Sequence, residues 1–293
     1  MSDEIEIVHI DLPAWVEAAR ANPVLFAQRQ ATEVVLTAIG LSKLLSEALV
    51  LKGGALMALA FKSDRATGDV DFTAQVPPED LVDKIKGELN GCIPASLKKL
   101  NYLDLLCQVQ TVKKKPRPQN FQNLEFPALD ISVGYARKGS PQEKWFIRGQ
   151  STQTLTLEIS FKDQVYQFQE LHLFDAHVCV KAFSINEIFA EKTRALIQQK
   201  AENRDRYRRQ DVFDLWYLLE NCQDEIEHSD TLKILRAKCE GRGISPSPES
   251  LADEEVRERA KKDWETIALE IGDLPDFNEC YSRVEEFYRN LPW

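Results

Sequence analysis

The sequence predicts an α+β protein with two lobes: residues 1–175 around a small mixed sheet, and a mainly helical lobe over residues 176–293. Between residues 49 and 174, apolar and polar residues alternate in short runs, which is the pattern of half-buried strands. Beyond residue 174 the pattern becomes mostly helical. A chain of 293 residues with 43% hydrophobic content is long enough to build a core in each lobe.

The first lobe is expected to begin with a helical lead-in. Residues 13–46 are rich in Ala, Leu, Val and charged residues, and they predict two helices that break near Asn22-Pro23. Alternating strands follow, with helices between them. The expected strands are residues 48–51, 69–73, 103–112, 128–135 and 154–161, and the expected helices are 55–61 and 78–89. This order predicts a small mixed sheet.

The second lobe is marked by capping patterns. Ser184 and Glu187 form a capping box, in which each side chain accepts a hydrogen bond from a free N–H at the start of a helix. Residues 241–248 contain two glycines and two prolines, so a surface loop is expected there. Ser250 with Asp253 is a second capping pattern, which predicts the start of the acidic C-terminal helices.

The net charge of −10 argues against a surface that grips nucleic acid over its whole extent. Two local basic runs differ from this average. Residues 113–117 contain three lysines and an arginine, and Arg204, Arg206, Arg208 and Arg209 form a second cluster. Either run is also typical of a solvated loop. A guanidinium group can bind two phosphate oxygens at once, so the arginine cluster is the better candidate for phosphate or RNA contact.

Cysteine spacing and hydropathy narrow the class of protein. The six cysteines are scattered without paired spacing, which argues against a zinc site or a disulfide framework. No apolar run approaches the length that spans a bilayer, and residues 1–10 are acidic and polar, unlike a secretory segment. We therefore expect a cytoplasmic protein with no membrane contact.

The main candidate site begins with Leu51-Lys52-Gly53-Gly54 and continues at Asp69-Val70-Asp71-Phe72. Glycines let backbone N–H groups approach a ligand, and a helix that starts just after them would offer free N–H groups to phosphate. In a strand the two aspartates share one face, and oxygen donors of this kind suit Mg²⁺ held together with a triphosphate. Each piece alone is weak, but their order and short separation indicate nucleotidyl transfer.

Such a site needs a third carboxylate from a neighbouring strand. Glu158 and Asp130 each lie on the polar face of a predicted strand, and periodicity cannot separate them. In the second lobe, Lys192 interrupts an apolar helical stripe. A buried ammonium needs an anion, so Lys192 either faces a cleft that receives phosphate or forms a buried ion pair with Asp211 or Asp214 on the next helix.

Four stretches resemble the AbiEii/AbiGii nucleotidyltransferase toxins, a branch of the DNA-polymerase-β-like nucleotidyltransferase superfamily that includes the MenT toxins. They are residues 50–56, 65–72, 191–196 and 208–215. The resemblance implies the nucleotidyltransferase fold, and its strand order favours Glu158 as the third acid. It implies catalytic roles for Asp69, Asp71, Glu158, Lys192 and Asp211, metal binding by Asp69, Asp71 and Glu158, and nucleotide contacts from Lys52, Gly53, Gly54, Arg65, Thr67, Lys192 and Arg208.

The resemblance also implies a reaction and a setting. An RNA 3′-hydroxyl, expected on the tRNA acceptor end, would attack the α-phosphate of an NTP and release pyrophosphate, with two Mg²⁺ ions, or Mn²⁺ in their place. A cognate antitoxin is the expected partner, within toxin–antitoxin or phage-defence systems. Alternatives are a small-molecule nucleotidyltransferase of the antibiotic-modifying kind, a metal-dependent glycosyltransferase, which fits the Gly-Gly helix start poorly, and a non-catalytic nucleotide-binding module.

Overall fold

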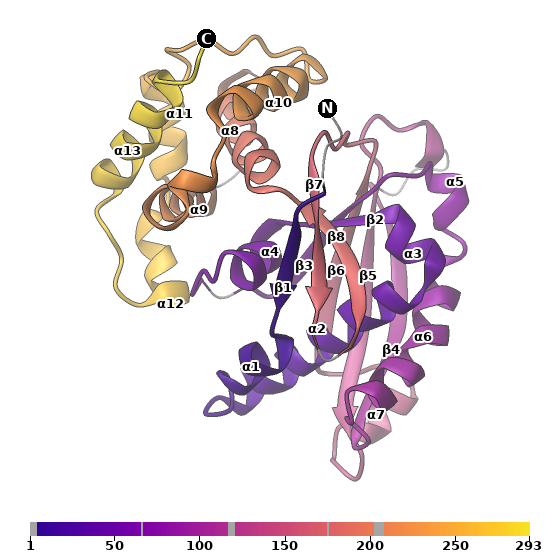
Figure 1. Ribbon diagram of the computed structural model, residues 1–293. Helices are drawn as coiled ribbons and strands as arrows, with labels where there is room; N and C mark the ends of the chain where they lie inside the picture. The colour runs from indigo at the N-terminus through magenta and orange to yellow at the C-terminus, as the bar shows by residue number, and fades with distance from the viewer. Residues whose placement is uncertain (1–4, 66, 117–120, 175, 202–207) are drawn as a thin grey trace. The chain divides into compact units, whose positions relative to one another are not determined.

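The computed structural model describes residues 5–65, 67–116, 121–174, 176–201 and 208–293 (Figure 1). The chain forms two compact units. The sheet unit comprises Met1–Ala60, Thr67–Gln164 and Phe168–Ala182, and the helical unit comprises Phe61–Ala66, Val165–Gln167 and Phe183–Trp293. The fold class is the expected one: a mixed α/β unit with a mixed sheet, and a mainly helical unit.

The sheet has eight strands in the order β1-β7-β8-β2-β3-β6-β5-β4. The strands are β1 Ile7–Ile10, β2 Leu49–Lys52, β3 Asp69–Ala74, β4 Leu105–Lys115, β5 Ala128–Arg137, β6 Thr154–Phe161, β7 Phe168–Leu173 and β8 Val178–Phe183. β3 runs parallel to β6, whereas β2 and β3, β5 and β6, and β4 and β5 are antiparallel pairs. The five predicted strands are confirmed, and the sheet is larger than expected by β1, β7 and β8.

The predicted boundary at residue 175 lies before β8, which pairs in parallel with β2. Sequence reasoning missed β7 because Gln169, a polar residue, occupies one of its buried positions, where it is 2% exposed. β1 is a run of four residues that pairs in parallel with β7. Four residues are too few for the alternation of apolar and polar side chains to identify a strand from the sequence alone.

Helices α2, α3 and α6 line one side of the sheet (Figure 1). The helices of this unit are α1 Leu12–Glu17, α2 Pro23–Leu41, α3 Lys43–Ala48, α4 Gly53–Ala60, α5 Pro78–Leu81, α6 Ile85–Lys99 and α7 Glu143–Ile147, with a 3₁₀ turn at Phe121–Asn123. The break predicted near Asn22-Pro23 is confirmed: Asn22 accepts a hydrogen bond from the Leu25 N–H, and Pro23 is the first helical residue.

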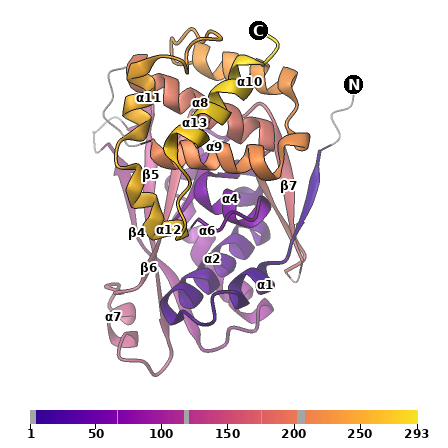
Figure 2. The same ribbon diagram turned by 90° about the vertical axis from the view of Figure 1, so that its left-hand side faces the viewer.

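The helical unit is built around α8 Ile185–Ala201, which packs against α9, α10 and α11 (Figure 2). The other helices are α9 Arg209–Asn221, α10 His228–Glu240, α11 Glu254–Lys261, α12 Ala268–Ile271 and α13 Phe277–Arg289, with 3₁₀ turns at Gln223–Glu225 and Trp264–Ile267. Its core contains large aromatic side chains such as Phe189, Tyr281 and Tyr288. No helix in the described ranges is both long and apolar enough to cross a membrane.

The two capping predictions fare differently. Ser184 accepts a hydrogen bond from the Glu187 N–H, so the start of α8 is as predicted. The Glu187 carboxylate instead accepts from the backbone N–H groups of Tyr166 and Gln167, so the reciprocal half of the box is wrong. The Ser250 cap is also wrong, because Asp253 itself accepts the first N–H groups of α11. A carboxylate that directly precedes a helix competes well for this role.

Candidate active site

A row of charged side chains crosses five neighbouring strands of the sheet. In the register, Lys52 on β2 lies opposite Asp71 on β3, and Asp71 lies opposite Glu158 on β6. Glu158 lies opposite Asp130 on β5, and Asp130 opposite Lys113 on β4. Residues directly opposite each other project from the same face of a sheet. The fold therefore brings together carboxylates that are widely separated in the sequence.

Asp69 adds a further carboxylate to this face, two residues before Asp71 on β3. Val70 and Phe72 alternate with the aspartates and are buried, as the period-2 pattern predicts. The turn before Asp69 is held in place: the Thr67 hydroxyl donates to the Asp69 carbonyl at 3.2 Å, and the Gln28 amide donates to the Gly68 carbonyl at 3.2 Å. Helix α2 thus anchors the turn that presents the first aspartate.

Gly53 brings the backbone of the Gly-Gly step against Asp71. Its φ is +71°, and a Cβ built on Gly53 would lie 2.2 Å from Asp71 Oδ2. Only glycine adopts this backbone conformation without steric cost, and only glycine leaves room for the carboxylate. Helix α4 begins at Gly53, two residues earlier than predicted, so Gly53 and Gly54 are its first residues. The two halves of the predicted site therefore meet in the structure.

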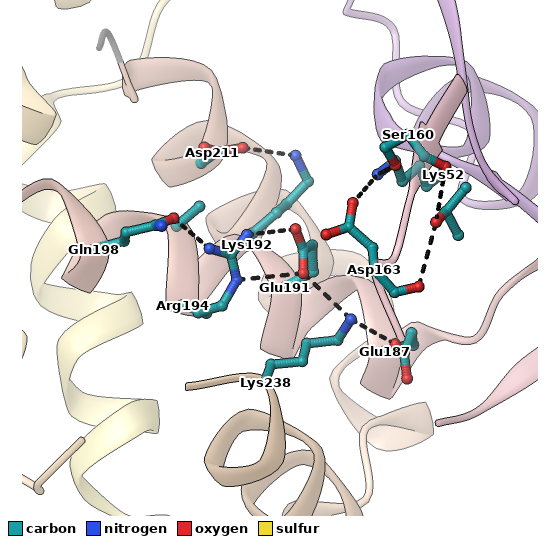
Figure 3. A network of polar contacts seen from close by, with 12 residues as sticks. Lys52, Ser160, Asp163, Glu187, Glu191, Lys192, Arg194, Gln198, Asp211 and Lys238 are labelled. Carbon is teal, nitrogen blue, oxygen red and sulfur yellow. Dashed lines mark hydrogen bonds and ion pairs between the residues drawn. The ribbon is translucent and has the colours of Figure 1, made fainter. Parts of the chain in front are cut away.

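Lys52 extends from the end of β2 toward β6. Its ammonium donates to the Ser160 hydroxyl at 2.7 Å and lies 3.3 Å from an oxygen of Asp163 (Figure 3). Ser160 is two residues after Glu158 on β6, so it shares the face of the carboxylates. The side chain of Lys52 is 18% exposed. The predicted phosphate-binding lysine is therefore beside the row of acids, where it pairs with Asp163.

Lys115, at the end of β4, supplies a cation to the other end of the acidic row. Its Nζ lies 2.6 Å from Asp130 Oδ2 and 4.0 Å from Glu158 Oε2. The hydrogen bond to Asp130 raises the pKa of Lys115, with contributions from Glu158 and Asp69. The position of this ammonium group beside the Asp130 and Glu158 oxygens is consistent with a negative potential on this face of the sheet.

The donor set fits a hard divalent cation. Carboxylate oxygens are the ligands that Mg²⁺ prefers, and the ion is commonly held by one or two carboxylates together with substrate phosphates. Asp69, Asp71 and Glu158 are all described residues, but their carboxylate oxygens do not all lie within 4.8 Å of one another. An ion held by these acids would therefore also need ligands from a triphosphate or from water.

In the helical unit, Lys192 forms ion pairs with two aspartates of α9. Its Nζ lies 3.0 Å from Asp211 Oδ1 (Figure 3). The same atom lies 2.7 Å from Asp214 Oδ2. Burial alone would raise the pKa of Asp211, but Lys192 and Arg208 outweigh burial and lower it. For Lys192, burial would lower the pKa, but the two aspartates raise it. The buried ion pair considered from the sequence is present, and Asp214 enlarges it.

Arg65 and Arg208 belong to the same network of charges. Arg65 is 8% exposed and binds Asp214 through two hydrogen bonds of 2.9 and 3.1 Å. A third bond of 3.0 Å joins Arg65 to Glu270. Arg208 donates to Asp211 at 3.1 Å. Both predicted phosphate-binding arginines therefore bond to carboxylates within this unit.

Parts of the basic runs lie outside the described residues, namely Arg117, Arg204 and Arg206. Sequence reasoning also missed several residues that complete these networks. Ser160 lies on β6, where the polar face was already assigned to Glu158, and Asp163 follows the strand, so neither residue gave a signal as a partner of Lys52. Glu270 is 205 residues from Arg65, and no local pattern links positions so far apart.

Comparisons with known proteins bear on the family and on the fold. The model of the family described as "Nucleotidyl transferase AbiEii toxin, Type IV TA system" matches residues 36–288. The structure of JHP933 from Helicobacter pylori has a TM-score of 0.54 at 15% identity, over 92% of this chain and 92% of that chain. MenT4, a nucleotidyltransferase toxin from Mycobacterium tuberculosis H37Rv, has a TM-score of 0.51 at 17% identity, over 94% and 87%. No curated protein gives a significant match.

Proposed function

Because the chain belongs to the AbiEii family of nucleotidyltransferase toxins, we propose that it transfers a nucleoside monophosphate from an NTP to an RNA 3′-hydroxyl. The expected acceptor is the 3′ end of tRNA, and a cognate antitoxin is the expected partner. The observation that carries the proposal is the meeting of Gly53 with Asp71, at the end of a row of acids on neighbouring strands. A helix start and two carboxylates side by side suit a triphosphate with its metal.

Asp69 and Asp71 are the proposed metal ligands, with Glu158 as the third. Both aspartates come from the same face of one strand, and the register places Glu158 beside Asp71. Bound Mg²⁺ or Mn²⁺ would neutralise the triphosphate and lower the pKa of the attacking hydroxyl. Asp130 is one strand further away and pairs with Lys115, so we assign it to lining the site.

The proposed chemistry is an in-line displacement. A bond forms between the RNA 3′-oxygen and the α-phosphorus, and the bond from the α-phosphorus to the bridging oxygen of the β-phosphate breaks. Glu158 is the candidate acceptor of the hydroxyl proton, because its side chain is 52% exposed on the face where the acids gather. Pyrophosphate leaves with the electrons of the broken bond.

The proposed nucleotide contacts of the sheet unit are the backbone N–H groups of Gly53 and Gly54, the ammonium of Lys52 and the turn at Thr67. Free N–H groups at the start of α4 favour anions. Lys52 is at the edge of the acidic row, where Asp163 and Ser160 orient it. A bound triphosphate would compete with Asp163 for this ammonium, which gives Lys52 a role in neutralising charge.

The proposed functional residues of the helical unit remain those that the family resemblance implies. Lys192, Arg208 and Asp211 lie in its later motifs, and Arg65 lies in the stretch that leads to Asp69. Their ion pairs support a positioning role at least as strongly as direct phosphate contact, because each charge already has a partner. Measuring stability and activity separately in a Lys192 variant distinguishes these two roles.

The test is to incubate the purified protein with Mg²⁺, total tRNA and each α-labelled NTP in turn, beside the Asp69→Ala variant. Label that enters tRNA with the wild type only supports the proposal and identifies the nucleotide. Asp83→Ala, a change to an exposed acid of the same unit, is the control and is expected to retain full activity. Transfer to small metabolites but not to tRNA would instead favour a small-molecule acceptor, and triphosphate binding without transfer would favour a non-catalytic module.

A further inference from the structure

A second group of metal-ligating side chains lies near the β1 edge of the sheet, separate from the carboxylates on β3, β6 and β5. Glu170 and His172 come from β7, and Cys179 comes from β8. We propose that Glu170, His172 and Cys179 bind one transition-metal ion, with Zn²⁺ as the expected ion. This inference does not depend on the proposed nucleotidyl transfer.

The distances suit a shared ion. One ligand atom from each of Glu170, His172 and Cys179 lies within 4.8 Å of the other two, and among the described residues this trio alone meets that limit. Glu170 Oε2 and His172 Nε2 are 3.4 Å apart. Two ligands with bonds of about 2.0–2.1 Å to one tetrahedral zinc ion are themselves about 3.4 Å apart. Glu170 and His172 contact each other through a hydrogen bond whose length is also the separation of two ligands of one ion.

His9 on β1 is the candidate fourth ligand. β1 pairs in parallel with β7, and the register places His9 opposite His172, so the two side chains share a face. Their ring centres are 5.5 Å apart. Two imidazoles bound to one tetrahedral zinc ion would have ring centres about 5 Å apart, given the usual bond length. β1 thus places His9 beside the trio, although its ring nitrogens are not among the ligand atoms that lie within 4.8 Å of one another.

The chemistry of the donors sets this cluster apart from the acidic row. A thiolate and imidazoles favour zinc and related ions, whereas carboxylates favour magnesium. A thiol binds a metal ion as the thiolate, so metal binding by Cys179 would release a proton. Cysteine spacing could not indicate this site, because it contains a single cysteine and its ligands meet only once the strands pair.

The test is zinc binding by the full chain, measured by competition with a chromophoric chelator after treatment with EDTA and dialysis. The Asp69→Asn variant serves as the background, so that the proposed catalytic acids are weakened as competing ligands. We expect one equivalent to bind, and affinity to fall at least 10-fold in His172→Ala and in Cys179→Ser. His177→Ala and Cys92→Ser change the same residue types elsewhere in the sheet unit and are expected to leave affinity unchanged.

Cobalt substitution gives a second readout that does not depend on activity. A thiolate-to-cobalt charge-transfer band is expected in the protein and should be absent from Cys179→Ser. The site is overturned if no equivalent binds, or if His172→Ala and Cys179→Ser bind zinc as the background variant does. His9→Ala should also weaken binding, and unchanged affinity would remove His9 from the ligand set.

Discussion

At the scale of single residues, Gly53 decides whether the Gly-Gly step and the aspartates can occupy one site. Its left-handed backbone is demanding for any other residue, and a side chain there would overlap Asp71. These are two separate costs. The strained backbone conformation lowers the stability of the protein. The overlap with Asp71 displaces a carboxylate of the site and lowers its activity.

The Gly53→Ala variant should therefore lose activity beyond what its loss of stability explains. Gly149 is a matched control, because its φ is also +71° and no atom lies within 4 Å of the Cβ it would gain. Both variants should be destabilised by about 1–2 kcal/mol, as measured by denaturant unfolding. Only Gly53→Ala should lose transfer, by roughly 10²-fold, because Asp71 must move. Equal activity in the two variants would contradict the role of Gly53.

The third acid can be identified by comparing Glu158 with Asp130. Lys115 lies 2.6 Å from Asp130 but 4.0 Å from Glu158, so Asp130 is already paired. Glu158→Gln should lower kcat by at least about 10²-fold, as expected for loss of a proton acceptor. Asp130→Asn should lower kcat by less than about 10-fold. The reverse order, measured as initial rates at saturating RNA, would assign the role to Asp130.

At this scale the sequence was informative where chemistry is local. The positions of Asp69 and Asp71 on one face follow from strand alternation within four residues. The proximity of Asp71 to Glu158 and Asp130 cannot be predicted in this way, because it depends on the position of β6 between β3 and β5. Arg65 illustrates the same limit: its partners Asp214 and Glu270 are 149 and 205 residues away.

At the scale of elements, α8 and α9 are joined through charged side chains as well as apolar ones. Lys192 on α8 bonds to both aspartates of α9, and Arg65 and Arg208 approach those aspartates from other directions. Breaking a buried ion pair by removing one partner leaves the other charge without compensation. The contact between these helices is therefore sensitive to single substitutions.

Lys192→Met should reduce the free energy of unfolding by about 3–5 kcal/mol, because two buried carboxylates lose their shared cation. Lys200→Met provides the control, since Lys200 is on the same helix but is 45% exposed where it pairs with Asp253. That change should cost less than about 1 kcal/mol. Loss of transfer by Lys192→Met without loss of stability would instead support a direct role in binding phosphate.

The destabilisation by Lys192→Met should also depend on pH. In the wild type the pKa of Asp211 is lowered, so its contribution to stability is complete above the unfolded pKa of about 3.9 and is lost as the pH falls below it. In the variant, the buried Asp211 carboxylate has lost the compensating charge of Lys192, so its ionised form destabilises the fold. Protonation of this carboxylate at low pH removes that destabilisation. The difference between the two proteins should be largest at neutral pH and shrink toward pH 3, as urea titrations would show.

At the scale of the whole molecule, the net charge is −10, so the proposed RNA acceptor would have to be held by a few local cations. Lys113 and Lys114 are exposed on β4, the last strand of the sheet order, and Lys113 is in register with Asp130. Lys113 lies beside the acidic row, whereas Lys114 projects from the other face of β4. Lys113 is therefore the candidate RNA contact of the sheet unit.

Replacing Lys113 by Ala should raise the KM for RNA and leave kcat unchanged. The slope of log KM against log salt concentration should fall by roughly 0.7–0.9, which corresponds to one lost phosphate contact. Lys99→Ala, at an exposed position on α6, provides a control with the same charge change. An equal effect of the two variants would indicate a general charge effect rather than a binding site.

The family and fold class could be predicted because the motifs and the strand alternation are both short-range signals. The size of the sheet could not, because β1, β7 and β8 carry weak local signals and are fixed by pairing across the sheet. The proximity of Glu170, His172 and Cys179, on which the proposed metal site rests, was missed for the same reason. What depends on neighbouring residues was predicted, and what depends on long-range pairing had to be observed.

The insertion of β6 between β3 and β5 also has a consequence for synthesis on the ribosome. β6 is the last of these three strands to be translated, although it occupies the middle position. At 5–20 residues per second, the interval between completion of β3 and completion of β6 is on the order of ten seconds. During that interval the nascent chain holds both aspartates but not Glu158. A polypeptide that terminates before Glu158 cannot contain the complete row, so prematurely released fragments of this toxin should be harmless to the cell that makes them.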